Sequence, residues 1–304
     1  MNLLANPVLA RELRGRIRGN RAMIILVIYL AIIAGVTLLV YAATASSFRG
    51  GINDPEAGRN IGKAIFMTVM SASLIQVCVI TPSLTAGAIS GEKERQTYDL
   101  LITTLLSPLQ IALGKLTSAL AFAMLLIIAA LPMAGLAFLF GGVSGIELLI
   151  GVLGLAVTAI CYATIGLFWS TVMRTTLAAT VMAQGTVIML LLLIPFLFVV
   201  SMMLTSSFGG LSDVFYIYTM GLLLSAHPFI ALGLSAGFLS SGEGPLLVKI
   251  SSDMGDLWLP SPWLVYIFIS VLLTAFFLTL TVRLLKPVQY ETRRRTTKDR
   301  SREV

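Results

Sequence analysis

Few side chains in this sequence could perform catalysis, and none falls into a pattern typical of an enzyme. His227 is the single histidine, and it precedes Pro228, where a histidine more often packs at a helix end than acts as a base or a ligand. The sequence contains neither the HExxH pattern of zinc peptidases nor the GxSxG pattern of serine hydrolases. We therefore expect no hydrolytic chemistry from this chain.

Two cysteines and one glycine-containing stretch are the other candidates for a chemical role. Cys78 and Cys161 fall inside long apolar runs, where cysteine acts as a small hydrophobic residue, so they predict neither a disulfide framework nor a metal site. The stretch from Gly58 to Ala64 is the nearest approach to a phosphate-binding loop, but its spacing is wrong and no Ser or Thr follows the lysine. We predict no catalytic, metal or nucleotide site, so any energy must come from another polypeptide.

Composition places the chain in a membrane. Of its 304 residues, 57% are hydrophobic and 12% are charged, against roughly 25% charged residues in soluble domains. Arginines between positions 11 and 21 precede a full-length apolar run, unlike a cleaved secretory signal, so the first span is expected to be retained. We predict one membrane domain over 1–304, with a basic interfacial helix at 1–21, a bundle at 22–285 and a basic tail at 286–304.

Long apolar runs predict an all-α integral membrane protein with six transmembrane helices. A helix needs about 20 apolar residues to cross a hydrocarbon core about 30 Å thick. Six runs meet this requirement: Ala22–Ala45, Ala64–Ser90, Gln110–Phe140, Ile146–Met173, Leu177–Leu204 and Trp263–Leu285. A further apolar stretch after Asp213 is interrupted by His227-Pro228.

The distribution of Lys and Arg orients these spans and argues against a seventh crossing. With the amino terminus in the cytoplasm, five basic residues precede the first span, three lie between the second and third, one is Arg174 and eight lie from Arg283 onward. Seventeen of the 21 are then cytoplasmic, as the positive-inside rule favours. A seventh crossing would put the basic tail outside, so we predict a multi-pass protein of the plasma (inner) membrane with both termini in the cytoplasm.

The segment 205–262 would then be external, although it is too apolar for a free loop. Its residues after Asp213 predict two short helices broken at Pro228, which form a re-entrant or interfacial hairpin. Such a hairpin could cap the outer mouth of a cavity, or it could be a helical lid that only packs against the bundle. Trp258 and Trp263 fit an outer interfacial anchor.

The segment between the second and third spans carries most of the functional information. Gly91 is expected to end the second span, and a quartet of mixed charge follows at 92–95. Apolar residues then recur at helical spacing and predict a short amphipathic helix along the cytoplasmic membrane face; they are Tyr98, Leu101, Ile102, Leu105 and Leu106. Ser107, Pro108 and Gln110 predict a capping box that begins the third span.

This segment resembles the signature of ABC transporter permeases of the type-2 exporter class. The resemblance rests on Gly-Glu-Lys-Glu-Arg-Gln-Thr-Tyr-Asp-Leu-Leu from Gly91, on Leu-Leu-Ser-Pro and on Leu-Gly-Lys115, together with the six spans, the basic amino-terminal helix and the apolar hairpin. It implies an ATP-driven exporter in which this segment is a coupling helix that contacts a separate cytoplasmic ATPase, the subunit that would bind ATP and Mg. The residues implied nearest that contact are Gly91, Glu92, Glu94, Arg95, Tyr98, Leu101 and Leu105. It also implies a dimer of two six-span halves, identical or paralogous.

The two basic termini are expected to lie at the membrane surface. Leu9, Leu13 and Ile17 are spaced four apart, and Arg14, Arg18 and Arg21 share another face of the same predicted helix. The candidate contact residues of this helix are Arg11, Arg14, Arg18 and Arg21. This helix could bind anionic lipid or touch the ATPase, or its charge could serve orientation alone. The tail after Pro287 is expected to anchor topology and not to bind nucleic acid, because it lacks interleaved aromatic residues beyond Tyr290.

Polar and small residues within the spans bear on mechanism. No ionisable group lies near a span centre, which disfavours an ion-coupled secondary carrier. Lys115 lies near a span end, where its side chain is expected to reach the interface. Gln76 is expected to make a hydrogen bond between helices. Ala31 and Gly35 could allow close approach of a second half or of a helix in the same chain. The remaining alternative to transport is a membrane scaffold that recruits a cytoplasmic partner.

Overall fold

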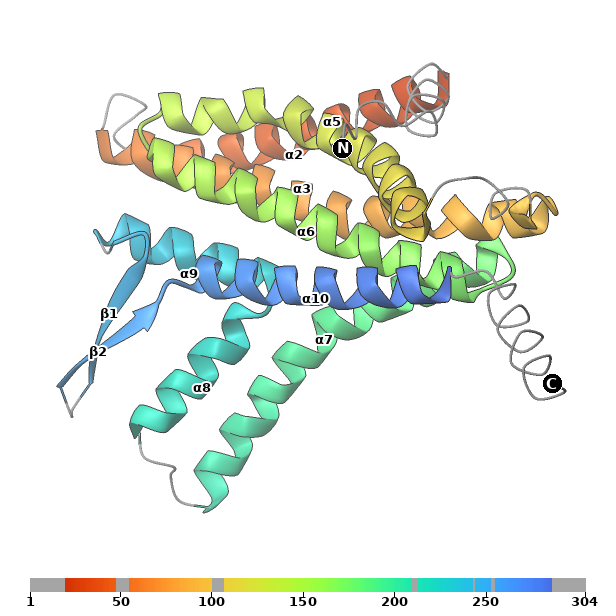
Figure 1. Ribbon diagram of the computed structural model, residues 1–304. Coiled ribbons are helices and arrows are strands. Elements are labelled where there is room, and N and C mark those ends of the chain that lie inside the picture. Colours follow the sequence, from red (N-terminus) through yellow and green to blue (C-terminus); the bar gives the residue numbers. More distant parts are fainter. Residues whose placement is uncertain are drawn as a thin grey trace, which may run out of the picture.

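The computed structural model describes residues 20–47, 55–99, 107–208, 213–242, 244–252 and 255–285 (Figure 1). These residues form a helical membrane protein with one small β-hairpin. In chain order the elements are α2 (Asn20–Ser47), α3 (Pro55–Glu94), α5 (Pro108–Leu139), α6 (Gly145–Val172), α7 (Thr176–Phe208), α8 (Asp213–Ser225), α9 (Pro228–Ser240), β1 (Leu247–Ser252), β2 (Gly255–Pro260) and α10 (Pro262–Leu284).

Six of these helices are long and apolar enough to cross a membrane: α2, α3, α5, α6, α7 and α10. Each matches one of the six predicted spans to within a few residues at the carboxyl end, so six long apolar helices in the predicted order are confirmed. The capping box predicted at the start of α5 is present, because Ser107 Oγ accepts the Gln110 N–H at 3.3 Å and Gln110 Oε1 accepts the Ser107 N–H at 2.8 Å.

Helix α3 departs most from its predicted bounds. It has 40 residues, about 60 Å at 1.5 Å per residue, roughly twice the thickness of a hydrocarbon core. Its charged ends, near Arg59 and at Glu92–Glu94, therefore extend beyond the apolar part of a bilayer. The expectation that Gly91 ends the helix is wrong: the helix continues to Glu94, and the chain turns at Gln96, whose φ is 58°.

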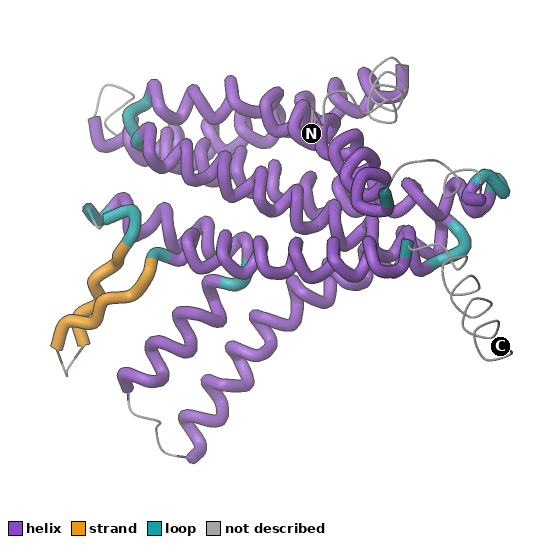
Figure 2. The backbone as a smooth tube through the Cα atoms, in the orientation of Figure 1, coloured by secondary structure: helices purple, strands orange, loops and turns teal. Residues whose placement is uncertain are grey.

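The helices surround α3, which packs against α2, α5, α6 and α7. Its contact with α6 is close because Gly166 has no side chain: a Cβ there would lie 2.4 Å from the Pro82 carbonyl oxygen and 2.2 Å from Thr85 Oγ1. In Figure 2 most of the long helices run in similar directions, while α7 diverges from the bundle and α8 returns beside it. The main core lies where α3, α5 and α6 meet, around Phe66, Leu126 and Leu155.

Helices α8 and α9 form the predicted pair of short helices. They meet at a bend of 114°, with the break at Ala226 and His227. Their outer ends lie at the end of the bundle that carries the β-hairpin, and their corner points toward the middle of the bundle (Figure 1). We call this the hairpin end, and the opposite end, which carries residues 91–99, the charged end.

The β-hairpin is the departure from the all-helical expectation among the described residues. Strands β1 and β2 pair antiparallel, with Val248 opposite Leu259 and Lys249 opposite Trp258. Successive strand residues face opposite sides, so Val248 and Leu259 are buried while Lys249 and Trp258 are exposed. The hairpin therefore has one apolar face toward the helices and one polar and aromatic outer face.

Candidate functional site

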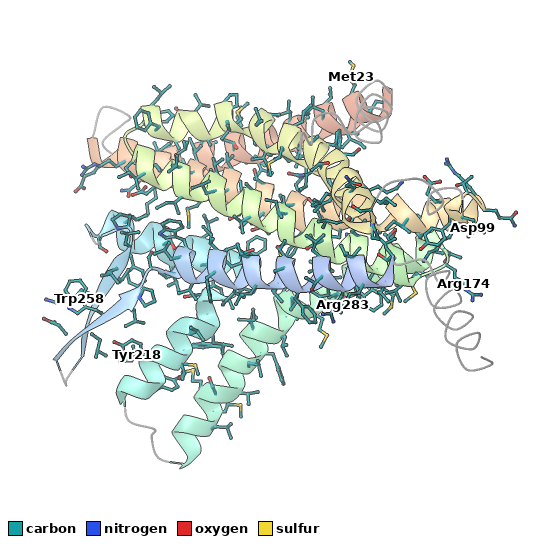
Figure 3. The ribbon with its side chains drawn as sticks, in the orientation of Figure 1. Met23, Asp99, Arg174, Tyr218, Trp258 and Arg283 are labelled. Carbon is teal, nitrogen blue, oxygen red and sulfur yellow. The ribbon has the colours of Figure 1, made fainter. Side chains whose placement is uncertain are left out.

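The charged end carries the described residues of the segment predicted to contact the ATPase. In Figure 3 Asp99, at the end of the 91–99 segment, lies near Arg174 in the turn between α6 and α7. The first four residues of the segment are the last residues of α3, so the longest helix of the bundle positions it. Three consecutive charged residues, Glu92, Lys93 and Glu94, each contact a different neighbouring helix.

Glu92 joins the segment to α5. Its Oε1 lies 3.2 Å from Lys115 Nζ, and the Lys115 side chain is only 4% exposed. The Glu92 carboxylate also accepts a hydrogen bond from the Thr97 hydroxyl. That hydrogen bond first, and then the nearby ammonium of Lys115, lower the pKa of Glu92 below its ordinary value. Both partners therefore favour the ionised carboxylate.

Lys93 joins the segment to the end of α6. Its Nζ donates to the backbone carbonyl of Thr171 and, at 3.2 Å, to that of Met173. The last carbonyls of a helix have no partner within the helix and carry partial negative charge, so an ammonium there satisfies and stabilises them. The same ammonium lies 5.4 Å from the centre of the Tyr98 ring.

Glu94 joins the segment to the start of α7. Its carboxylate accepts the backbone N–H of Thr176 at 2.8 Å and the Thr176 hydroxyl at 2.7 Å. An anion suits this position because the first N–H groups of a helix carry partial positive charge. These two hydrogen bonds lower the pKa of Glu94. Lys93 and Glu94 thus match the dipoles of two helix ends with opposite charges.

Tyr98 and its neighbours form the outer surface of the segment. The Tyr98 ring packs against the apolar cluster at the charged end, which includes Ile89, Leu116 and Leu285. A hollow of about 660 Å³ lies beside it, lined by Lys93, Gln96, Tyr98, Asp99, Val172 and Arg174. Arg95, Gln96 and Asp99 are exposed there. The segment therefore presents a polar edge to solvent while its other side is tied to the bundle.

The residues predicted to contact the ATPase point in different directions. Glu92 and Glu94 turn toward α5 and α7, whereas Arg95 faces outward. Gly91 lies against α7, where a Cβ would be 3.8 Å from Thr176 Oγ1. Leu101, Leu105 and the amino-terminal arginines Arg11, Arg14 and Arg18 lie outside the described residues, as does the side chain of Arg21. Their roles stay predictions.

Lys115 and Gln76 differ from their expected roles. Lys115 was expected to reach the membrane interface, but it is buried and paired with Glu92. Gln76 was expected to bond between helices, but neither amide atom has a hydrogen-bond partner among the described residues, although the residue is 6% exposed. Gln76 is therefore packed inside the bundle, with its amide unpaired among the described residues. Sequence patterns hold no signal for either outcome, since both depend on which helix faces which.

His227 caps the second helix of the α8–α9 pair. As the N-cap of α9, its Nδ1 accepts the Ile230 N–H at 3.3 Å, and Pro228 occupies the first helical turn. The His227 ring lies 5.8 Å from the ring of Phe229, which packs against the apolar cluster that includes Val187 of α7. His227 therefore caps α9 at the break between the two helices.

Comparison with known proteins gives one informative result. A family model described as "ABC-2 family transporter protein" matches residues 6–287, nearly the whole chain. The comparison with curated proteins found no match. The matched range includes the six spans, the 91–99 segment and the α8–α9 pair.

Proposed function

Because the chain belongs to the ABC-2 family of transporter proteins, we propose that it is the membrane permease subunit of an ATP-driven exporter. Membership of the family makes it a multi-pass membrane component of a transporter. The finer statements, an exporter powered by separate ATPase subunits and built from two permease halves, are our proposal. The observation that carries it is the 91–99 segment, which is tied to three helices at once.

The charged end faces the cytoplasm in this proposal, with both termini on that side of the plasma (inner) membrane. The ATPase docks on the exposed edge formed by Arg95, Gln96 and Asp99, and on the following residues through Leu105. ATP and Mg are held by that ATPase. The dense charge at this end, including Arg174 and Arg283, supports the orientation through the positive-inside rule.

Movement of the docked segment would reach the bundle through the three contacts. Closure of the ATPases displaces residues 91–99, and the Lys115, Thr171 and Thr176 contacts transmit that displacement to α5, α6 and α7 together. Helix α7 packs against α8, and Phe229 of α9 packs against the apolar cluster that includes Val187 of α7, so movement of α7 reaches the α8–α9 pair. The α8–α9 pair acts as a re-entrant helical hairpin over the outer mouth of the transport path. Cargo with hydrophobic or amphipathic character suits spans that lack central charges.

The second half is expected to pack on α2. Ala31 and Gly35 are exposed on this helix, and a Cβ at Gly35 would meet nothing within 4 Å. The chain therefore does not use these small residues for its own packing. Small residues four apart let two helices approach closely in a membrane, which suits a partner half.

Co-purification followed by reconstitution tests the proposal. The chain would be expressed with an ATPase encoded beside it, purified as a complex and placed in vesicles. ATP turnover that rises with a hydrophobic or amphipathic compound, together with movement of that compound across the vesicle membrane, supports export. Stable binding of the ATPase without stimulated turnover supports the scaffold, and transport that needs an ion gradient without an ATPase supports a secondary carrier.

A further inference from the structure

A pocket of about 370 Å³ lies at the hairpin end, between α8, α9, the β-hairpin and α10. Its walls include Ile217, Gly221, Leu234, Val248, Leu259 and Val265. This volume falls within the range of small-molecule sites, about 300–1,000 Å³. The pocket lies far along the bundle from the 91–99 segment, so it is separate from the candidate coupling site (Figure 3).

The pocket exists because of the β-hairpin and one glycine. Alternation along the two strands turns Val248 and Leu259 toward the helices, where they are 1% and 8% exposed. Gly221 on α8 faces Leu259, and a Cβ at that position would lie 2.8 Å from Leu259 Cδ2. A larger side chain at 221 would therefore project into the space between α8 and the hairpin.

The chemistry of the walls selects an apolar occupant. Most of the lining is hydrocarbon. Of the polar groups at its border, the Ser225 hydroxyl donates to the Gly221 carbonyl at 2.5 Å, and the Tyr218 hydroxyl donates to the Trp258 carbonyl at 3.0 Å. A ligand with polar groups inside the pocket would leave them without hydrogen bonds, which is costly. A hydrocarbon chain has no polar groups, so its burial carries no such cost.

The surface beside the pocket indicates where such a chain comes from. Leu222, Leu246 and Leu247 are 60%, 59% and 52% exposed around this end. In a chain that spans a membrane, large exposed apolar side chains face lipid. Trp258, exposed on the outer face of β2, and Tyr218 are the aromatic types found at membrane interfaces. The pocket is thus continuous with a lipid-facing surface at interfacial depth.

We propose that this pocket binds one acyl chain of a bilayer phospholipid, drawn from the leaflet at the hairpin end. The chain fills the space between α8 and the β-hairpin, and the headgroup stays at the interface beside Trp258. Binding holds α8 against the hairpin, because the occupant contacts both. The proposal does not depend on ATP, on an ATPase or on the direction of transport.

Photolabelling with a phospholipid tests this site. The full chain is placed in nanodiscs that contain a phosphatidylethanolamine with a diazirine on one acyl chain, irradiated, digested and mapped by mass spectrometry. We expect labelling of peptides from 216–225 and 246–265 to exceed that of the exposed α7 peptide 177–193 by about fivefold or more. Equal labelling of all lipid-facing helices would overturn the proposal.

Pocket-filling variants separate specific binding from general lipid contact. Gly221→Leu should lower the labelling of those two peptides at least fivefold while the α7 peptide keeps its own. Gly185→Leu is the matched control, because Gly185 lies exposed on α7 with nothing within 4 Å of an added Cβ. Unchanged labelling of the pocket peptides in Gly221→Leu would also contradict the proposal.

Leu234→Phe fills the same pocket from α9 and covers the case in which Gly221→Leu does not fold. Native mass spectrometry of the detergent-purified chain provides the second measurement. We expect the wild-type protein and Gly185→Leu to retain one phospholipid that the filled variant loses. Retention of a bound small amphiphile in place of phospholipid would assign the pocket to another occupant and overturn the proposal.

Discussion

The ammonium of Lys115 lies 3.2 Å from the carboxylate of Glu92, which joins the end of α3 to the second turn of α5. The lysine is buried, while the Glu92 side chain is 34% exposed. A buried ammonium is retained in a protein when an anion and hydrogen bonds compensate for lost water. The pair is therefore a fixed connection between the charged segment and the bundle.

Removal of this ion pair should weaken both stability and coupling. Glu92→Gln keeps the side-chain shape but removes the charge, and we expect a loss of about 1–3 kcal/mol, seen as a lower Tm of the purified chain. The double variant Glu92→Lys with Lys115→Glu should recover part of that loss, because it restores opposite charges. A Tm in Glu92→Gln equal to that of the wild-type protein would show that the pair has no structural role.

Arg95 should behave differently from Glu92 because it faces outward. We expect Arg95→Glu to leave the Tm of the isolated chain unchanged and to reduce both ATPase binding and transport-linked ATP hydrolysis. Affinity measured by titrating the purified ATPase onto the chain checks this prediction. Glu92→Lys is the comparison variant, since it should lower Tm as well as hydrolysis. Unchanged hydrolysis in the Arg95→Glu complex would contradict the assignment of this edge.

Loss of the Glu94 cap should loosen the start of α7. Glu94→Gln keeps one acceptor for Thr176 but removes the negative charge from the helix N-terminus. We expect faster hydrogen exchange of the first α7 amides, 176–179, with little change in the centre of α6. Thr176→Val should give a smaller effect, because the backbone hydrogen bond to Glu94 remains. Unchanged exchange at 176–179 in Glu94→Gln would rule out the capping role.

His227 should matter for the α8–α9 pair through its N-cap. His227→Ala removes the cap, and loss of an N-cap costs about 0.5–2 kcal/mol. His227→Asn is the matched control, because asparagine can still cap α9. We expect hydrogen exchange to rise at 229–231 in the alanine variant only. Equal exchange at these amides in both variants would exclude the capping role.

The small residues on α2 predict a contact between two halves. Gly35→Leu should reduce the fraction of dimer, measured by size-exclusion chromatography with light scattering of the complex in nanodiscs. Gly135→Leu on α5 is the control, because its added Cβ also meets nothing within 4 Å. An undiminished dimer in Gly35→Leu would place the second half on another face.

Sequence patterns predicted a helix or a helix boundary correctly where one local physical property decides it. The six spans follow from apolar length alone, and Ser107 with Gln110 predicts the start of α5 because capping is a local interaction. The break before Pro228 is local for the same reason, since proline cannot continue a helix. The prediction that the helix ends at Gly91 was wrong because the residues that follow, Lys93 and Glu94, make hydrogen bonds at the ends of α6 and α7 and continue the helix.

Contacts between distant residues were not predictable in the same way. The pairing of Glu92 with Lys115 and of Glu94 with Thr176 depends on which helices are neighbours, and a single sequence does not encode this locally. The β-hairpin did leave a signal, namely the alternation of Val248 with Lys249 and of Trp258 with Leu259 in two stretches separated by a glycine-containing segment. The sequence analysis predicted two short helices after Asp213 and an interfacial anchor at Trp258 and Trp263, and it did not predict strands at 247–260.

Site-specific photocrosslinking of the complex tests the central claim most directly. A photoreactive amino acid is placed at Arg95, Gln96 or Asp99, or at Leu149, which is exposed on α6, and each chain is expressed with the ATPase. We predict that positions 95, 96 and 99 capture the ATPase and that position 149 does not. An intact complex in which none of the three positions captures the ATPase would contradict the account.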